Sequence, residues 1–230
     1  MKKNMTTVMR LLQFTDSAFP VGTFSFSNGL ETAAHEGIVY NADTLEKYAH
    51  AIALQAAYSD GVVALHAFRA ANDDKYEALL AADRQLMLFK MNEEARQMLR
   101  RMGKKLAELS THIFDKPILH QWLDDIQKET APGTYPVAQA LAFSMAGLSE
   151  EDLFCSHQYG VINMVLSAAL RCVKVSHYDT QRILFRLSEQ SQELYEEVRT
   201  MTFTDMNAFV PQIDILASLH EKGNMRMFMN

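Results

Sequence analysis

The sequence predicts an all-α protein, a single compact helical domain over residues 1–230 with roughly eight to eleven helices. Three observations support this fold class. Apolar residues recur at spacings of three and four, as in Met98, Leu99, Met102 and Leu106. Cap and turn residues separate the periodic segments, and no apolar/polar alternation is long enough to predict a strand. The composition, 48% apolar and 22% charged, is that of a globular protein.

The expected helices follow this pattern along the chain. The segments, in order, are 5–14; 30–35, closed by Gly37; a long helix from Thr44, capped by 41–43, that Gly61 bends or divides before 62–70; 76–89, after a break and cap at 72–74; 93–114; a short segment from Pro117; 137–146; 153–175; a helix capped by Asp179 and Thr180 that runs to about Val198; and 211–221. Gly103 lies inside the helix expected over 93–114, which indicates close packing there.

A non-helical segment near the N-terminus, Phe14 to Gly29, is unusually apolar. Pro20 and two glycines break the chain, yet Phe14, Phe19, Val21, Phe24 and Phe26 make the segment too apolar to lie free in water. Two interpretations remain open: the segment covers helix ends in its own core, or it forms part of a protein-binding surface.

Composition and motifs narrow the function classes. A formal net charge of −6 argues against a general nucleic-acid binder. Two cysteines, interpreted as small core side chains, favour a reducing compartment. No signal peptide or membrane span is expected, so the protein is expected to be cytoplasmic. The sequence contains no nucleophile elbow, phosphate loop or dinucleotide fingerprint.

Two Glu/His pairs have a spacing at which both side chains could bind one metal ion. Glu31 with His35 and Glu46 with His50 stand four residues apart, so each pair shares one helical face. They define the alternative to an interaction protein, an all-helical metalloenzyme. The simpler interpretation of such pairs is surface hydrogen bonding. A generic helical interaction module is a further alternative.

The C-terminal tail, 223–230, combines one basic residue with methionines and a phenylalanine. Chain ends are usually polar and frayed. A sticky tail, with methionines that adapt their shape, is expected to be flexible or to dock on a partner or on its own domain.

Two long motifs stand at opposite ends of the chain. The first, residues 11–31, reads LLQFTDSAFPVGTFSFSNGLE. The second comprises PQIDI at 211–215 and His220-Glu221, followed after four residues by Arg226-Met-Phe228. GTYPVA at 133–138 and AALR at 168–171 lie between them. In this order the motifs resemble the UreF family of urease accessory proteins over nearly the whole chain.

The resemblance implies an all-α fold, no catalytic chemistry, no cofactor and work inside a complex. Members of the family form dimers, bind the accessory protein UreD (also called UreH) and thereby recruit the GTPase UreG, so that nickel reaches apo-urease. For this chain the resemblance implies one of two roles, regulation of GTP hydrolysis or a place on the metal's route.

The resemblance also assigns partner binding to residues of both motifs, because the family's C-terminal tail orders on the UreD-type partner. In the tail, Arg226 is expected to make a charge-assisted contact and Phe228 to fill a pocket. The assigned residues are Pro20, Gly22, Phe24, Ser25, Ser27, Gly29, Glu31, Pro211, Asp214, His220, Glu221, Arg226 and Phe228.

The sequence departs from the family pattern at three places. The family usually has a second glycine at the position of Thr23 and a histidine at that of Phe26, so a nickel-handling loop histidine is not available. A Pro-Leu-Gly turn of the family is replaced by Val175-Ser-His177, so that the helix is expected to run on or to turn differently.

Overall fold

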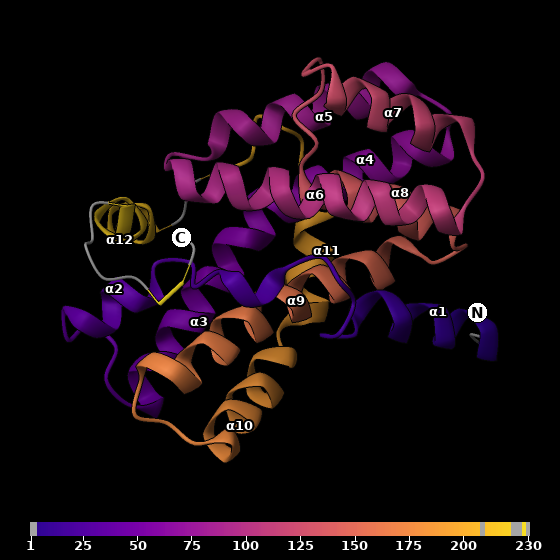
Figure 1. The fold of residues 1–230 in the computed structure, drawn as a ribbon. Helices are drawn as coiled ribbons and strands as arrows, with labels where there is room; N and C mark the ends of the chain where they lie inside the picture. Colours follow the sequence, from indigo (N-terminus) through magenta and orange to yellow (C-terminus); the bar gives the residue numbers. More distant parts are fainter. Residues whose placement is uncertain (1–3, 208–209, 222–226, 229–230) are drawn as a thin grey trace.

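The computed structural model describes residues 4–207, 210–221 and 227–228, except for the side chain of Phe24. The all-α prediction is confirmed: these residues form helices and no strand (Figure 1). The elements are α1 Met5–Thr15, η1 Thr23–Ser25, α2 Leu30–His35, α3 Ala42–Ala56, η2 Ala57–Gly61, α4 Val62–Asn72, α5 Tyr76–Phe89, α6 Glu93–Ile113, α7 Pro117–Gln127, α8 Tyr135–Met145, α9 Glu150–Cys172, α10 His177–Ser188, α11 Ser191–Val198 and α12 Pro211–Glu221.

Helices α3 and α4 form one continuous rod. The rod begins with a capping box formed by Asn41 and Thr44, which confirms the cap predicted at 41–43. The sequence predicts a bend or a division of the helix at Gly61. The structure has a single π-helical turn there, η2, and the backbone stays in the right-handed helical conformation on both sides of it. Counting the rod once leaves eleven separate helices among the described residues, the upper end of the predicted number.

Some expected boundaries are wrong for identifiable reasons. The cap of α10 is Ser176, whose side chain accepts from the Asp179 main-chain N–H, so Asp179 belongs to the first turn instead of preceding it. The helix expected to run to Val198 is two helices, α10 and α11, which are separated at 189–190. Lys75 precedes α5 without a side-chain cap, so the cap expected at 72–74 is absent.

The turn at 173–177 shows how the chain leaves α9 where Val175-Ser-His177 departs from the family pattern. Helix α9 ends at Cys172 instead of running to Val175, and Val173 is extended. The main-chain N–H of Val175 donates to the Val173 carbonyl at 2.9 Å, and the Ser176 capping box then starts α10. The helix therefore does not run on, because a serine cap replaces the family's turn.

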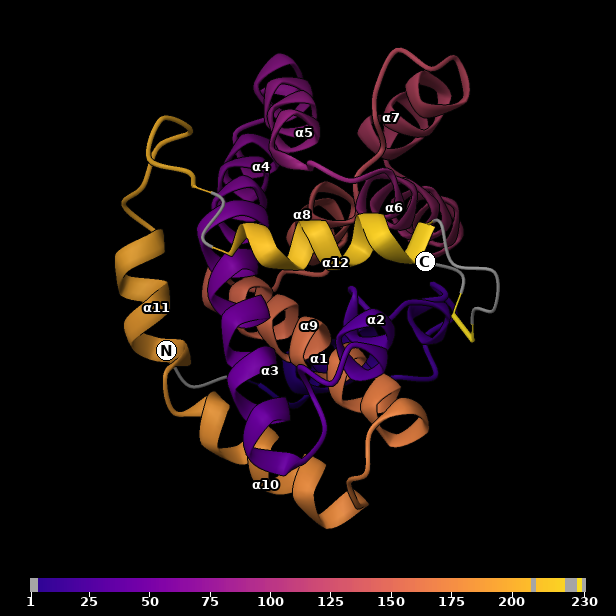
Figure 2. The ribbon, with the colours of Figure 1, turned by 90° about the vertical axis from the view of Figure 1, so that its left-hand side faces the viewer.

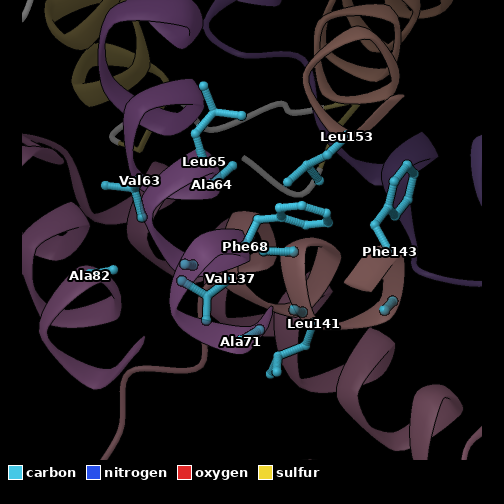
Figure 3. Close-up of a cluster of buried hydrophobic side chains, with 14 of the residues drawn as sticks. Val63, Ala64, Leu65, Phe68, Ala71, Ala82, Val137, Leu141, Phe143 and Leu153 are labelled. Atoms are coloured by element: carbon cyan, nitrogen blue, oxygen red, sulfur yellow. The ribbon is translucent and has the colours of Figure 1, made fainter. Parts of the chain in front are cut away.

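Two clusters of buried apolar side chains form the core. The first lies among α4, α5, α6, α8 and the start of α9, and it includes Phe68, Leu141, Phe143 and Leu153 (Figure 3). The second lies among α2, α3, α9, α10 and α12. Helix α12 crosses the side of the molecule between the α6 group and α2 (Figure 2), and it contacts both.

The predicted close packing at Gly103 is confirmed. A Cβ atom there would lie 2.0 Å from the main-chain oxygen of Gly133, so α6 meets the loop before α8 without room for a side chain. Asp83, fully buried, accepts the main-chain N–H groups of Gly133 and Thr134 at 2.9 Å each. Burial raises the pKa of Asp83. These contacts fix the loop between α7 and α8.

A buried ion pair lies in the π-helical turn. Asp60 binds the ammonium group of Lys90, and both side chains are almost buried. Burial alone would raise the pKa of Asp60, but the charge of Lys90, together with His157 and the hydrogen bonds from Lys90 and Ser59, outweighs burial and the pKa is lowered. Nearby, burial lowers the pKa of His157, whose Nδ1 lies 3.0 Å from Gln139 Oε1. Removing one member of such a pair leaves an uncompensated buried charge.

Two expectations about α9 need correction. Cys155 is exposed and Cys172 half-buried, so the cysteines are not both core side chains. Helix α9 also has the length and apolar composition of a membrane span, which the sequence analysis did not expect. Most of that stretch is buried inside the fold, as in the core helix of a globular protein.

Candidate functional site

The aromatic N-terminal segment packs largely on the first core cluster. Phe14, Val21 and Phe26 are buried, and the Phe14 ring lies 5.9 Å from that of Phe143. For these three side chains the core-covering interpretation holds. Phe26, which stands where the family usually has a histidine, is therefore a core residue.

The turn at the end of this segment places Glu31, in the first turn of α2, beside the second cluster. Asn28 and Gly29 both have positive φ, and the Tyr48 hydroxyl donates to the Asn28 carbonyl at 2.7 Å. A Cβ atom on Gly29 would lie 3.2 Å from the main-chain nitrogen of Ala217. Glycine is therefore required here both for the left-handed turn and for the close approach of α12.

Glu31 meets the last helix through a buried histidine. His220 Nε2 lies 2.9 Å from Glu31 Oε2, and His220 Nδ1 lies 2.8 Å from Glu94 Oε1 on α6. Each ring nitrogen faces a carboxylate oxygen, and each hydrogen bond needs one proton between the two atoms. Both bonds therefore form together only if both ring nitrogens are protonated, or if one ring nitrogen and the carboxyl that faces the other nitrogen are protonated. One histidine thus joins α2, α6 and α12.

The same carboxylate holds the C-terminal segment. The main-chain N–H groups of Met227 and Phe228 donate to Glu31 at 2.8 and 3.2 Å. Burial raises the pKa of Glu31, but these two N–H groups and His220 together outweigh it, so the pKa lies below 4.5. We call Glu31, Glu94, His220, Met227 and Phe228 the terminal junction.

Phe228 is seated on the chain's own surface. Its side chain is 4% exposed within the second cluster, and the guanidinium carbon of Arg171 lies 4.0 Å from its ring centroid. This cation–π geometry adds a directional contact to apolar burial. Phe228 is therefore buried by this chain itself, and a pocket for it on a partner stays a prediction.

Two further contacts tie α12 to the start of α6. Asn92 caps α6 and donates its amide to Asp214 at 2.7 Å. Glu221 accepts the main-chain N–H groups of Glu93 and Glu94 at 3.0 and 3.2 Å. A carboxylate at a helix N-terminus satisfies free N–H groups and complements the helix dipole.

The other predicted residues lie around this arrangement. Pro20 and Gly22 are exposed at the loop tip, Ser25 is half-buried, and Ser27 is buried. Pro211 is the exposed first residue of α12. The side chain of Phe24, and Arg226 with most of the tail at 223–230, lie outside the described residues.

The two Glu/His pairs do not form shared sites. Glu31 is turned to the terminal junction, while His35 contacts Glu36 at the surface. Glu46 pairs with Arg186 across to α10, and His50 lies 2.8 Å from Gln190. Among the described residues, no group of three or more His, Cys, Asp or Glu side chains is placed to hold a metal ion.

Sequence reasoning missed three residues of this region, Asn92, Glu94 and Arg171, as parts of a site. An Asn followed by two glutamates is a helix-start signal, which explains Asn92 as a cap but not as a partner of Asp214. No local pattern identifies Arg171 as the cover of Phe228, because the two are brought together only by the fold.

Apolar side chains are exposed near the junction and on α1. Ile215, Leu219 and Met227 are each at least half exposed on α12 and the tail. Met5 and Met9 are also well exposed on α1. Exposed apolar side chains beside a polar, hydrogen-bonded network are typical of protein-interaction surfaces.

Comparison with known proteins agrees with the motifs. A family model, UreF, matches residues 39–188. "Urease accessory protein UreF 2" of Brucella canis is 44% identical over 228 residues, covering 99% of this chain and 94% of the relative. "Urease accessory protein UreF 1" of Brucella melitensis is 43% identical, covering 99% and 95%. "Urease accessory protein UreF" of Yersinia pseudotuberculosis is 40% identical, covering 99% and 100%.

These names define the class, accessory proteins of urease, as the resemblance predicted. The matches extend over nearly the full chain and so include both end motifs and the helices between them. The chain belongs to the UreF family.

Proposed function

We propose that this chain is a non-enzymatic, cytoplasmic adaptor of urease maturation. It forms a dimer, binds a UreD/UreH-type accessory protein and through it recruits or regulates the GTPase UreG during nickel delivery to apo-urease. Membership of the UreF family supports the general role. The terminal junction supports the part that concerns partner binding.

The single observation that carries the proposal is that both family motifs meet in one place. Glu31 of the first motif binds His220 and the main-chain N–H groups of Met227 and Phe228 of the second. These groups are local in space but lie 189 or more positions apart in sequence. A partner that binds α12 and the tail is therefore proposed to contact the N-terminal motif as well.

The junction gives this surface a rigid base and an apolar rim. His220 and Phe228 are buried and anchored, whereas Ile215, Leu219 and Met227 remain exposed beside them. Exposed apolar side chains held by a fixed support lose little conformational freedom on docking, which favours affinity. Arg226 and Phe24 are proposed as further contacts of this partner surface.

The dimer is proposed to form elsewhere, on α1. Met5, Met9 and Leu12 share one exposed apolar face of that helix. Figure 1 places α1 and α12 on opposite sides of the molecule. A second copy on α1 therefore leaves the α12 surface open for the UreD-type partner.

Deletion of residues 223–230 tests the partner surface. The shortened chain is expected to stay folded, because the two core clusters are formed almost entirely by earlier residues. It is expected to lose co-purification with the UreD-type partner. Phe228→Ala in the full chain should weaken the same interaction by about tenfold or more, since the buried Phe228 side chain anchors the segment that carries the exposed Met227.

The matched control is Tyr178→Ala, which removes an aromatic side chain that is 88% exposed on α10. Circular dichroism and thermal melting establish that each variant is folded. Equal partner binding by the deleted and intact chains, with both folded, would show that the tail is not the docking element.

A further inference from the structure

We propose that the outer face of α6 docks a carboxylate-rich surface of a protein in the urease-maturation assembly. The α6 basic face consists of Arg100, Arg101, Lys104 and Lys105, all of them exposed. The inference rests on the proposed function, because it assumes that the chain works within that assembly. It adds a second, electrostatic surface to the apolar one at the terminal junction.

This face concentrates positive charge in an acidic protein. The chain has a formal net charge of −6, yet four of its 22 Lys and Arg residues fall within six consecutive positions of one helix. Residues four apart on a helix share a face, so Arg100 lies beside Lys104 and Arg101 beside Lys105. The charges therefore add at one place instead of being spread over the surface.

The charges of this face are mostly uncompensated. Lys105 lies 3.5 Å from Glu108, a contact between two half-exposed side chains. Within the described part of the chain, Arg100, Arg101 and Lys104 have no ion pair. Several other cations of the described residues are paired, namely Arg69–Glu150, Lys75–Asp73, Lys90–Asp60, Lys128–Asp124, Arg182–Asp179, Arg186–Glu46 and Arg199–Glu196. What distinguishes the α6 basic face is that its cations without an ion pair are adjacent on one helix.

The cluster does not stabilise its own helix. Like charges at a spacing of four destabilise a helix, and α6 carries two such pairs side by side. They lie along the middle of α6, far from its last turn, where positive charge would complement the helix dipole. A contribution to folding therefore does not account for this arrangement.

The fold holds this face rigidly at the surface. Leu99, Met102 and Leu106 on the opposite side of α6 are buried, and Gly103 touches the loop before α8. Helix α6 crosses the near side of the molecule in Figure 1 and lies at its right-hand edge in Figure 2. The backbone that carries the four cations is thus preorganised for binding.

Charge complementarity selects an acidic protein as the occupant. Arginine binds carboxylates through two parallel hydrogen bonds, and the two arginines of the face offer that geometry. A domain that binds nucleic acid is usually basic overall, whereas this chain has a formal net charge of −6, so four local cations match a limited acidic protein surface better than an extended polyanion. A symmetric pairing with α6 of a second copy would bring eight cations together, because each copy contributes four.

The basic face also lies close to the terminal junction. Glu94, in the first turn of α6, belongs to the junction, and Arg100 follows about 9 Å further along the helix axis. One partner can therefore span both surfaces, with apolar contacts at α12 and steering charges at α6. Such an arrangement raises the association rate more than it slows dissociation.

A charge-reversal experiment tests the proposal. The variant Arg101→Glu/Lys104→Glu is compared with Lys47→Glu/Lys174→Glu, which makes the same change in net charge at two other exposed lysines. Association of each full-length protein with purified UreD-type protein, UreG-type GTPase and apo-urease is measured by biolayer interferometry at about 50 and about 500 mM salt. We expect the α6 variant to associate about tenfold more slowly with one of them at low salt, and the control to stay within about twofold of the wild type.

Each other outcome is decisive. Equal association of both variants with a partner that the wild type binds overturns the role of α6 while leaving the proposed function intact. Absence of wild-type binding to all three proteins overturns the proposed function and this inference together. Binding of a short DNA duplex or of phosphatidylserine vesicles that is lost only in the α6 variant would identify a polyanion site instead.

Discussion

The two core clusters are joined to their surroundings in different ways. In the first, α6 and the loop before α8 approach at the level of the main chain, with Gly103 against Gly133 and Asp83 capping the loop from beneath. In the second, the terminal segments are held by hydrogen bonds to Glu31 and by one aromatic side chain. The first kind of contact is lost only on unfolding. The second depends on one carboxylate and one buried ring, so a change at a single residue is expected to release the terminal segment.

The largest expected effect separates two helical glycines. Gly103→Ala should destabilise the protein by about 3 kcal/mol, because the new methyl group would collide with main-chain atoms that cannot rotate away. In Gly160→Ala, on α9, the methyl group meets no atom within 4 Å, so that stability should rise by up to about 1 kcal/mol through helix propensity. Urea denaturation of both variants measures the difference.

These two substitutions make the same chemical change in the same secondary structure, so propensity cancels and packing remains. Similar stabilities for the two variants would mean that α6 and the loop move apart at little cost. The first cluster would then be no more rigid than the second.

A smaller and pH-dependent effect is expected at the terminal junction. Glu31→Gln keeps the shape of the side chain but removes the charge that accepts from the Met227 and Phe228 main-chain N–H groups. The pKa of Glu31 is lowered in the folded state. The ionised carboxylate therefore stabilises the fold fully above pH 4.5, and this contribution is lost as the pH falls through the folded-state pKa. The free energy of unfolding of the wild type should therefore exceed that of the variant by about 1 kcal/mol at neutral pH, and the two values should converge in acid.

Urea denaturation at neutral and at acidic pH measures the convergence, and amide hydrogen exchange at Met227 and Phe228 localises it. We expect faster exchange of these two amides in the variant at neutral pH, with the first cluster unchanged. A stability difference that persists unchanged in acid would assign the effect of residue 31 to packing instead of charge.

The difference between the clusters also explains what the sequence could predict. Helix positions were predictable because caps and apolar periodicity are local signals, and Asn41 and Gly103 each carried the expected meaning. The split between α10 and α11 was not, since the same apolar spacing continues across 189–190. The motifs identified the family without revealing that Glu31 meets His220, because contacts between distant segments depend on the topology of the whole chain.

The candidate site shows the same limit in its aromatic residues. Phe26 and Phe228 are both phenylalanines in signature motifs, and composition alone could not assign one to the first core and the other to a seat beneath Arg171. Burial depends on which helices surround a side chain, and only the fold specifies them. Sequence patterns therefore identified the participants of the terminal junction better than their contacts.

The smallest expected effect concerns a surface pair at the edge of the second cluster. Glu46 on α3 and Arg186 on α10 lie 3.2 Å apart with both side chains partly exposed, over a boundary that Leu45, Ile183 and Leu187 already fill. A double-mutant cycle with Glu46→Gln and Arg186→Gln should give a coupling energy of about 0.3 kcal/mol that disappears in high salt. A coupling above about 1 kcal/mol would show that surface charge adds materially to the apolar packing that holds α10 against α3. The contrast with the first cluster would then extend beyond the terminal junction.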